Sequence, residues 1–178
     1  QLRQELLRSA DESVRQSGQR FFKEPVMLLG VKAADVKRIA ASHFRQVKGK
    51  DKVEVFALCE QLLEQGYLEE AFVAFEWSYG LRKRFAPEDF AVFERWVDRY
   101  VDNWATCDSL CTHALGCFVE MYPQFVENLH GWARADNRWL RRASAVTLIL
   151  PARKGLFLNE AFEISDILLR DEDDMVQK

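Results

Sequence analysis

The sequence predicts an all-α fold made of short helices, and three observations support this prediction. Apolar residues recur at steps of three and four, for example at Phe90, Phe93 and Val97, which is the spacing of one helical face. No segment alternates apolar and polar residues between Asn-Gly or Asp-Gly turns, so no sheet is expected. The 178 residues include only 8 Gly and 4 Pro, too few for the many turns of a β-sandwich or barrel.

Turn-forming residues divide the chain into helices of about 12–16 residues joined by short loops. In chain order, these breaks are Ser17-Gly18, Pro25 to Gly30, Lys48-Gly49-Lys50, Gln65-Gly66, Tyr122-Pro123, Asp136-Asn137 and Pro151 to Gly155. The apolar faces between the breaks are marked by Leu2, Leu6, Leu7, Ala10 and Val14, by Val36, Ile39 and Ala40, by Phe56, Cys59, Leu62 and Leu63, and by Phe90, Phe93, Val97, Tyr100, Val101 and Trp104. Pro87 precedes the last of these faces, where a first helical position tolerates proline.

A similar pattern returns every 36 residues, at 67–71, 103–107, 139–143 and 175–178. Each segment reads as a bulky or polar residue, an apolar one, two mostly polar ones and a small one. Such a period is typical of helix-pair solenoids, because one pair cannot bury its apolar face alone. We therefore expect residues 1–178 to form a single helical-repeat domain. The helix that starts near Asp171 stops after about one turn, so we expect C-terminal capping helices beyond Lys178.

The charges are segregated along the chain, although the net charge is only −3. Residues 1–55 carry 12 basic and 7 acidic side chains, residues 129–155 carry 6 basic and 1 acidic, and residues 156–178 carry 2 basic and 7 acidic. The acidic balance argues against indiscriminate nucleic-acid binding. If folding brings the two basic blocks together, they form one basic face.

No membrane, secretion or metal signal is present. No apolar run approaches the roughly 20 residues that cross a bilayer, and no basic-then-apolar leader occurs, so we expect a cytoplasmic protein. Cys107, Cys111, His113 and Cys117 lie close in sequence, but their spacing differs from that of paired zinc turns. Buried cysteines in a reducing cytosol are the better interpretation, and neither a metal nor a cofactor is expected.

Two groups of residues are candidates for chemistry. Trp104 and Asp108 are four residues apart, which places an indole and a carboxylate on one helical face. The alternative is that Trp104 only continues the apolar stripe from Phe90 and that Asp108 caps a helix. In the second group Asp136 caps a helix, and Arg141 and Arg142 point about 100° apart, so at most one is expected on the inner face. These arginines form either a solvated basic face or a phosphate clamp.

The order of these motifs resembles the AlkD-like DNA alkylation-repair family, whose members are HEAT-like repeat DNA glycosylases. The resemblance runs from about Gly30 to Lys178. In chain order, it is carried by Leu29-Gly30-Val31-Lys32, Asp35-Val36-Lys37-Arg38-Ile39-Ala40, Trp104 with Asp108, Trp132-Ala133, Asp136-Asn137 with Trp139-Leu140 and Arg142-Ala143, and Val176-Gln177-Lys178.

The resemblance implies a HEAT-like α-α superhelix whose concave basic surface holds duplex DNA. It also implies hydrolysis of the N-glycosidic bond of cationic N3- and N7-alkylated purines, without a metal and without a deep base pocket. By the same resemblance, Asp108 falls on the catalytic carboxylate and Trp104 on the aromatic residue that packs the deoxyribose. Arg142 falls on an arginine that contacts the DNA backbone. Further DNA contacts are expected at Arg141, Arg138, Lys32 and Arg38, and the protein is expected to act as a monomer on alkylated duplex DNA.

Three positions depart from the family pattern. Phe21 stands where active members carry a tyrosine, Leu150 stands where some carry a lysine, and the second active-site tryptophan would lie past Lys178. Two alternatives therefore stay open. One is a non-catalytic binder of branched or distorted DNA on the same scaffold, and the other is a helical-repeat scaffold for protein partners.

Overall fold

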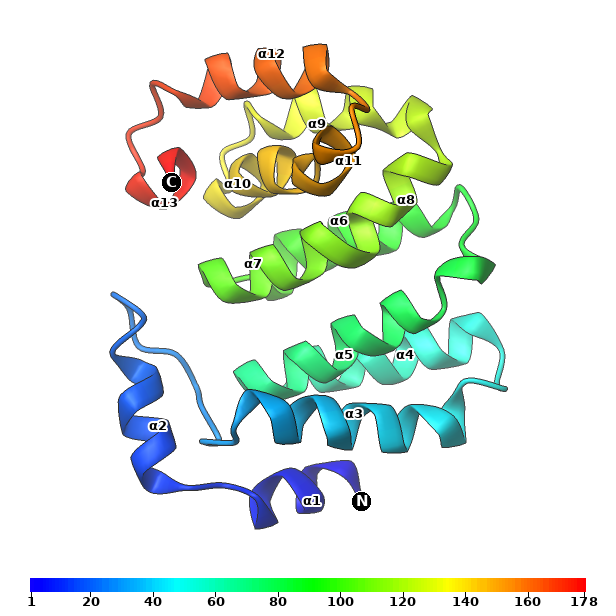
Figure 1. The fold of residues 1–178 in the computed structure, drawn as a ribbon, viewed down its shortest axis with the longest axis vertical. Helices are drawn as coiled ribbons and strands as arrows, with labels where there is room; N and C mark the ends of the chain where they lie inside the picture. The colour runs from blue at the N-terminus through cyan, green and yellow to red at the C-terminus, as the bar shows by residue number, and fades with distance from the viewer. The chain divides into compact units, whose positions relative to one another are not determined.

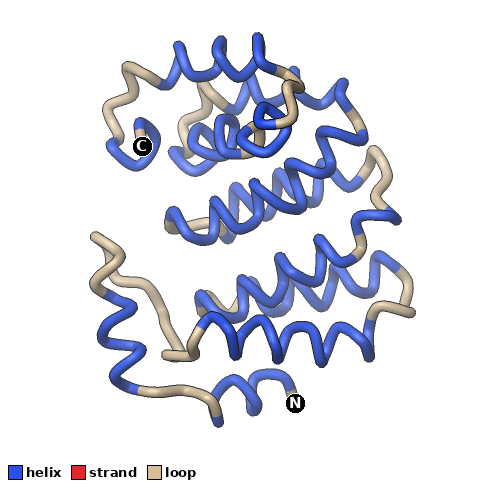
Figure 2. Tube along the Cα trace, viewed as in Figure 1, coloured by secondary structure: helices blue, strands red, loops and turns tan.

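The structure is a computed structural model that describes residues 1–178, and it contains helices and loops but no β-strand (Figures 1 and 2). This confirms the predicted all-α fold class. No helix combines the length and the apolar character that crossing a bilayer requires. The chain divides into two compact units, Gln1–Arg84 and Phe85–Lys178, which are described separately. The single helical-repeat domain stays a prediction.

The first unit consists of three long helices, two short ones and a 3₁₀ turn. They are α1 (Leu2–Arg8), α2 (Glu12–Gln19), α3 (Ala33–Val47), α4 (Lys52–Leu63), α5 (Leu68–Gly80) and η1 (Arg82–Arg84). The core lies where α5 packs against α3 and α4, and it includes the fully buried Ile39, Val55 and Val73. Trp77 ties α5 to α3, because its indole N–H donates to the Ala40 carbonyl at 2.9 Å.

The turn before α3 is held by a buried carboxylate on α5. Glu69 is almost fully buried, and its oxygens accept the backbone N–H groups of Leu29, Gly30 and Val31 at 2.9, 2.8 and 3.0 Å. Gly30 has φ +88°, and a Cβ there would lie 2.5 Å from the Asp11 carbonyl oxygen. This explains the glycine and gives the 29–32 motif a structural role, which is to fix where α3 begins.

The second unit is built from shorter helices. They are α6 (Asp89–Tyr100), α7 (Trp104–Leu110), the π-helical segment η2 (Cys111–Leu115), α8 (Gly116–Met121), the 3₁₀ turn η3 (Pro123–Phe125), α9 (Val126–Trp132), α10 (Arg138–Val146), α11 (Ile149–Arg153), α12 (Leu158–Leu168) and α13 (Asp174–Gln177). Its core is aromatic: Phe93 packs edge-on against Phe118, with ring centroids 5.7 Å apart, and against Phe85 at 5.2 Å. Trp96 is fully buried beside Phe93.

Several predicted helix boundaries are wrong: the stripe from Leu2 to Val14 is divided between α1 and α2, the expected break at Ser17-Gly18 lies inside α2, and Pro151 lies inside α11. Two further errors involve an asparagine. The stripe from Phe90 to Trp104 is not one helix, because α6 ends at Tyr100 and Asn103 caps a new helix by accepting the N–H groups of Ala105 and Thr106, each at 3.0 Å. The cap of α10 is Asn137 rather than its neighbour Asp136, since the Asn137 side chain accepts the Trp139 N–H at 2.9 Å. In both cases an asparagine supplies the oxygen that the first turn of the helix needs.

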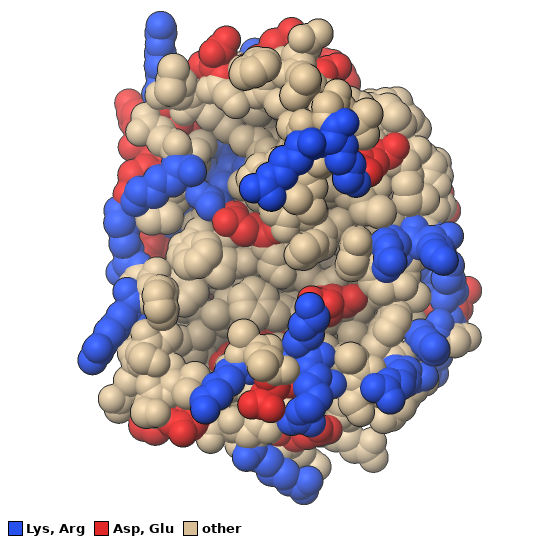
Figure 3. Space-filling view, viewed as in Figure 1, with Lys and Arg blue, Asp and Glu red and all other residues tan.

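The helix starts carry the period that the sequence shows. Helices α3, α5, α7, α10 and α13 begin at Ala33, Leu68, Trp104, Arg138 and Asp174, at intervals of 35, 36, 34 and 36 residues. The predicted period is therefore present in the secondary structure. The Lys and Arg side chains on the face drawn in Figure 3 are interspersed with Asp and Glu over both units, so the concave basic surface stays a prediction.

Candidate functional site

Asp108 on α7 and Arg142 on α10 form a bidentate ion pair. Arg142 Nε donates to Asp108 Oδ1 at 2.9 Å, and Arg142 Nη2 donates to Oδ2 at 3.0 Å. The Asp108 side chain is 34% exposed, whereas that of Arg142 is only 11% exposed. The guanidinium therefore lies inside the fold, and the carboxylate keeps a side that solvent or a ligand can reach.

The start of α7 places Trp104 beside Asp108. Trp104 is the first residue of the helix and is half-buried, and Asp108 follows one turn later on the same face. Asp108 is an interior residue of α7, so the alternative that it caps a helix is wrong. Trp104 likewise begins a new helix rather than ending the stripe from Phe90.

The helix that carries Asp108 changes its geometry directly after the site. The Thr112 hydroxyl donates to the Asp108 carbonyl at 2.7 Å, and residues Cys111–Leu115 form a π-helical turn before α8. A Cβ on Gly116 would lie 3.1 Å from the Thr147 carbonyl oxygen, so this glycine permits the close approach of α8 to the end of α10. A π-turn is uncommon and occurs often at functional sites.

Arg142 has a third partner besides the two oxygens of Asp108, since its Nη1 donates to the carbonyl of Met175 on α13. Burial acts to lower the pKa of Arg142, but the hydrogen bond and the charge of Asp108, with smaller contributions from Cys107 and Cys111, raise that pKa above its usual value. The guanidinium stays charged, as arginine does throughout the accessible pH range.

The other two candidate arginines of α10 contact the segment between α12 and α13. Arg141 binds Asp171 through Nε–Oδ2 at 2.6 Å and Nη2–Oδ1 at 3.2 Å, and its Nη1 donates to the carbonyls of Ala135 and Asp136. Arg138 pairs with Asp173 at 3.2 Å, and its guanidinium lies 4.7 Å from the Trp139 ring centre. These contacts show that Arg141 holds two loops together.

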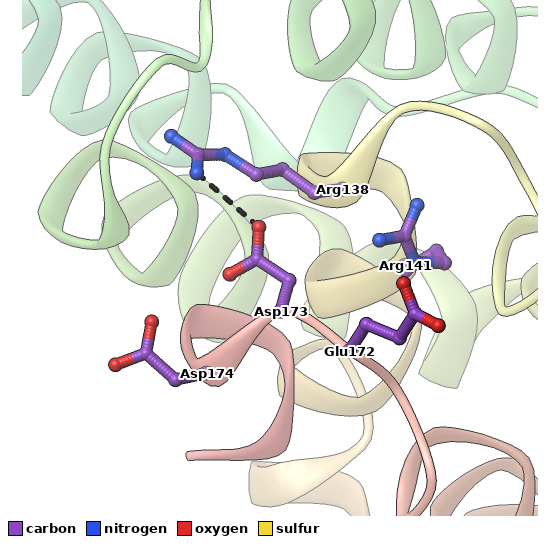
Figure 4. A pocket seen from close by; sticks show the side chains of 5 residues that line it. All are labelled: Arg138, Arg141, Glu172, Asp173 and Asp174. Carbon is purple, nitrogen blue, oxygen red and sulfur yellow. Dashed lines mark hydrogen bonds and ion pairs between the residues drawn. The ribbon is translucent and has the colours of Figure 1, made fainter.

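A shallow pocket of about 650 Å³ opens between these arginines and the acidic segment (Figure 4). It is lined by Arg138, Arg141, Glu172, Asp173 and Asp174. Figure 4 shows Arg138 reaching toward Asp173, with their ion pair as a dashed line. All five lining residues are charged and both signs are present, so the chemistry of the pocket suits an anion that could replace a carboxylate rather than a flat base.

The two candidate lysine and arginine residues of the N-terminal basic block lie in the other unit. Lys32 is the exposed cap residue of α3. Arg38 is exposed on the same helix and pairs with Asp35 at 3.2 Å and with Glu5 at 3.6 Å. Phe21 is 74% exposed in the loop after α2, and Leu150 is half-buried on α11. The structure thus brings together Trp104, Asp108 and the three α10 arginines within one unit.

The sequence reasoning missed the carboxylates that hold the α10 arginines. In the sequence, Asp171 and Asp173 belong to the acidic segment 156–178, which follows a basic block of opposite charge. Hydrogen bonding by Arg141, partly opposed by burial, lowers the pKa of Asp171. The opposite charges of residues 129–155 and 156–178 indicate that the two segments attract each other, but they do not specify which acidic residue pairs with which basic one.

The cysteines near the site are buried thiols. Cys107 and Cys111 are fully buried and Cys117 is half-buried, and no group of three His, Cys, Asp or Glu side chains is placed to hold a metal ion. Burial is the main cause that raises the pKa of Cys107, whose thiol faces the Trp139 carbonyl at 3.8 Å. A neutral buried thiol is a poor nucleophile.

Comparison with known proteins finds a matching family and a similar solved structure. The family described as "DNA alkylation repair enzyme" matches residues 2–178. Among solved structures, the chain is similar to one titled "Predicted DNA alkylation repair enzyme from Enterococcus faecalis", with a TM-score of 0.83 and 15% sequence identity, over 95% of this chain and 78% of that one. At this identity the likeness shows a shared fold. No curated protein sequence matches this chain.

Proposed function

Because the chain belongs to the family of DNA alkylation repair enzymes, we propose that it is a DNA glycosylase that hydrolyses the N-glycosidic bond of cationic N3- or N7-alkylated purines in duplex DNA. The observation that carries this proposal is the Asp108 carboxylate. It is one-third exposed, follows the half-buried Trp104 by one helical turn, and is oriented by two bonds from Arg142.

The chemistry of the lesion fits such a site. An alkylated purine already carries a positive charge, so it leaves readily and needs no strong general acid. As the bond breaks, positive charge develops on the sugar, and a preoriented carboxylate stabilises that charge more in the transition state than in the ground state. The same carboxylate can orient the attacking water.

Trp104 and Arg142 would have supporting roles. The indole face of Trp104 attracts a cationic sugar through its quadrupole. Arg142 keeps Asp108 in one orientation through its two hydrogen bonds. Selectivity would come from the weakened bond of the lesion rather than from a tight base pocket, in contrast to enzymes that flip and enclose the base.

A second candidate is a non-catalytic binder of distorted or branched DNA on the same scaffold. The observation that favours it is that both oxygens of Asp108 already accept a hydrogen bond from Arg142, which reduces the carboxylate's capacity to stabilise another cation. Phe21, which lacks the hydroxyl of the tyrosine that it replaces, points the same way.

The test is base release from methylated duplex DNA, followed by chromatography of the free bases. The wild type should liberate 3-methyladenine or 7-methylguanine. Asp108→Asn should slow this release by about 10²- to 10³-fold while it still binds the duplex. Asp166→Asn, which removes the same charge at an exposed position of α12, is the matched control and should behave as the wild type.

The outcomes separate the candidates. Binding of duplex DNA without base release by the wild type would identify the non-catalytic binder. Absence of any salt-dependent affinity for DNA would instead favour a scaffold for protein partners, because phosphate contacts make DNA binding fall steeply with salt.

A further inference from the structure

All three α10 arginines that were predicted to contact DNA are bound by one short segment of the same unit. This arginine row consists of Arg138, Arg141 and Arg142. Arg141 and Arg142 lie three and four positions after Arg138, so each is its neighbour on the helix surface, although the two point about 100° apart from each other. The segment is residues 171–175, and its first four residues, Asp-Glu-Asp-Asp, are named the acidic strap. Asp171 binds Arg141, Asp173 binds Arg138, and the carbonyl of Met175, directly after the strap, binds Arg142.

The strap is anchored at one end. Arg141 and Asp171 form two bonds at 2.6 and 3.2 Å, with side chains only 20% and 10% exposed. Asp171 also accepts the Asp173 N–H at 2.9 Å, and the Gln177 side chain donates to the Asp171 carbonyl at 2.7 Å. Arg141 therefore anchors the strap to α10.

At the other end of the strap, the ion pair between Asp173 and Arg138 can be replaced by another anion. The contact between Arg138 and Asp173 is longer, at 3.2 Å, and the Arg138 side chain is 31% exposed at the rim of the shallow pocket. A carboxylate and a phosphate oxygen offer a guanidinium the same kind of charge-assisted bond. Asp173 thus presents to Arg138 the chemistry that a DNA phosphate would present.

We propose that the acidic strap is an intramolecular substitute for DNA phosphate, and that Asp173 competes with duplex DNA for Arg138. This inference rests on the proposed DNA binding and adds its regulation. Because Asp171 and Met175 keep the strap against α10, Asp173 acts at a high effective concentration. Only an anion held in place by further contacts, such as a phosphate of a bound duplex, displaces it, while isolated phosphate does not.

The experiment measures the affinity for a short duplex at about 50 mM salt, where phosphate contacts are strong. Asp173→Asn removes the competing charge but keeps the helix cap, since Asp173 Oδ1 accepts the Met175 N–H at 2.8 Å and asparagine caps equally well. The matched control is Glu172→Gln. It removes the same charge from the neighbouring exposed residue, which makes no hydrogen bond or ion pair.

We expect Asp173→Asn to tighten binding about two- to fivefold, the range of a partly exposed ion pair. Glu172→Gln should change affinity less than twofold, through the general field alone. The same comparison in an Arg138→Gln background should reduce the effect of Asp173→Asn to that of Glu172→Gln, because the competitor then has no arginine to release. Asp173→Ser, another capping residue without charge, serves if the asparagine variant does not fold, as checked by thermal melting.

Each result decides the proposal. Equal effects of the Asp173 and Glu172 changes, with the wild type binding DNA normally, would overturn the strap and leave the proposed function intact. A gain that persists in the Arg138→Gln background would also overturn it. Binding by Asp173→Asn and Asp173→Ser but not by the wild type would support the strap in its strongest form. If no protein in the set binds DNA, the strap and the proposed function fail together.

Discussion

Arg142→Ala should destabilise the second unit, because Asp108 and Met175 then lose their shared partner. An exposed ion pair contributes about 0.2–1 kcal/mol, and breaking a buried one costs about 3–5 kcal/mol. The pair lies between these limits, since Arg142 is 11% and Asp108 34% exposed. We therefore expect a loss of about 2 kcal/mol, which corresponds to a fall in Tm of about 4–8 °C for a chain of this size.

The assay is urea unfolding of Arg142→Ala, Arg142→Lys and the control Arg134→Ala. Lysine keeps the charge but cannot bind both carboxylate oxygens in a fork, so it should recover about half of the loss. Arg134 is exposed and donates to the His130 carbonyl at 3.0 Å, so its removal should change stability by less than about 0.5 kcal/mol. A double-mutant cycle with Asp108→Ala should give a coupling of about 1 kcal/mol or more. If Arg142→Ala were as stable as Arg134→Ala, the ion pair would contribute nothing and the reasoning would be refuted.

Two further changes test other carboxylates. Hydrogen bonding to Arg141 lowers the pKa of Asp171 below 3.8. The pairing of the two residues therefore stabilises the fold above about pH 4, and this stabilisation is lost as the pH falls through the lowered pKa. Asp171→Asn should be less stable than the wild type at pH 7, with a smaller difference at pH 3, and an equal difference at both pH values in denaturant unfolding would contradict this sign. Glu69→Ala removes the acceptor of three backbone N–H groups around Gly30 and should cost about 3 kcal/mol or more, whereas Glu76→Ala, at an exposed position of the same helix, should cost less than about 0.5 kcal/mol.

Local patterns in the sequence predicted most of the secondary structure. The apolar spacing and the turn residues gave helices in the right order, and the 36-residue interval reappears in the helix starts. Several boundaries are wrong, and most helices are shorter than the expected 12–16 residues. One kind of error occurs where an asparagine interrupts the apolar stripe. Asn103 ends the run from Phe90 and starts a new helix at Trp104, because its side chain satisfies two N–H groups that a continuous helix would have bonded otherwise.

At the candidate site too, local spacing predicted some features and only the tertiary structure decided others. The four-residue spacing placed Trp104 and Asp108 on one face of α7, and the 100° between Arg141 and Arg142 predicted that at most one of them lies on the inner face. Both interpretations need only the geometry of a single helix. In the structure the two arginines have different partners, since Arg142 binds Asp108 and Arg141 binds Asp171.

By itself, the sequence determined the helical class, the period of the helix starts and the neighbours within each helix, because these depend on interactions between residues a few positions apart. Only the tertiary structure decided that Asp108 meets Arg142 across 34 positions and that an acidic strap, rather than solvent, binds the other arginines. Before the chain folds, a charged side chain can meet many oppositely charged residues. The packing of α7, α10 and α13 selects one partner for each arginine of α10, and no local sequence pattern specifies that partner.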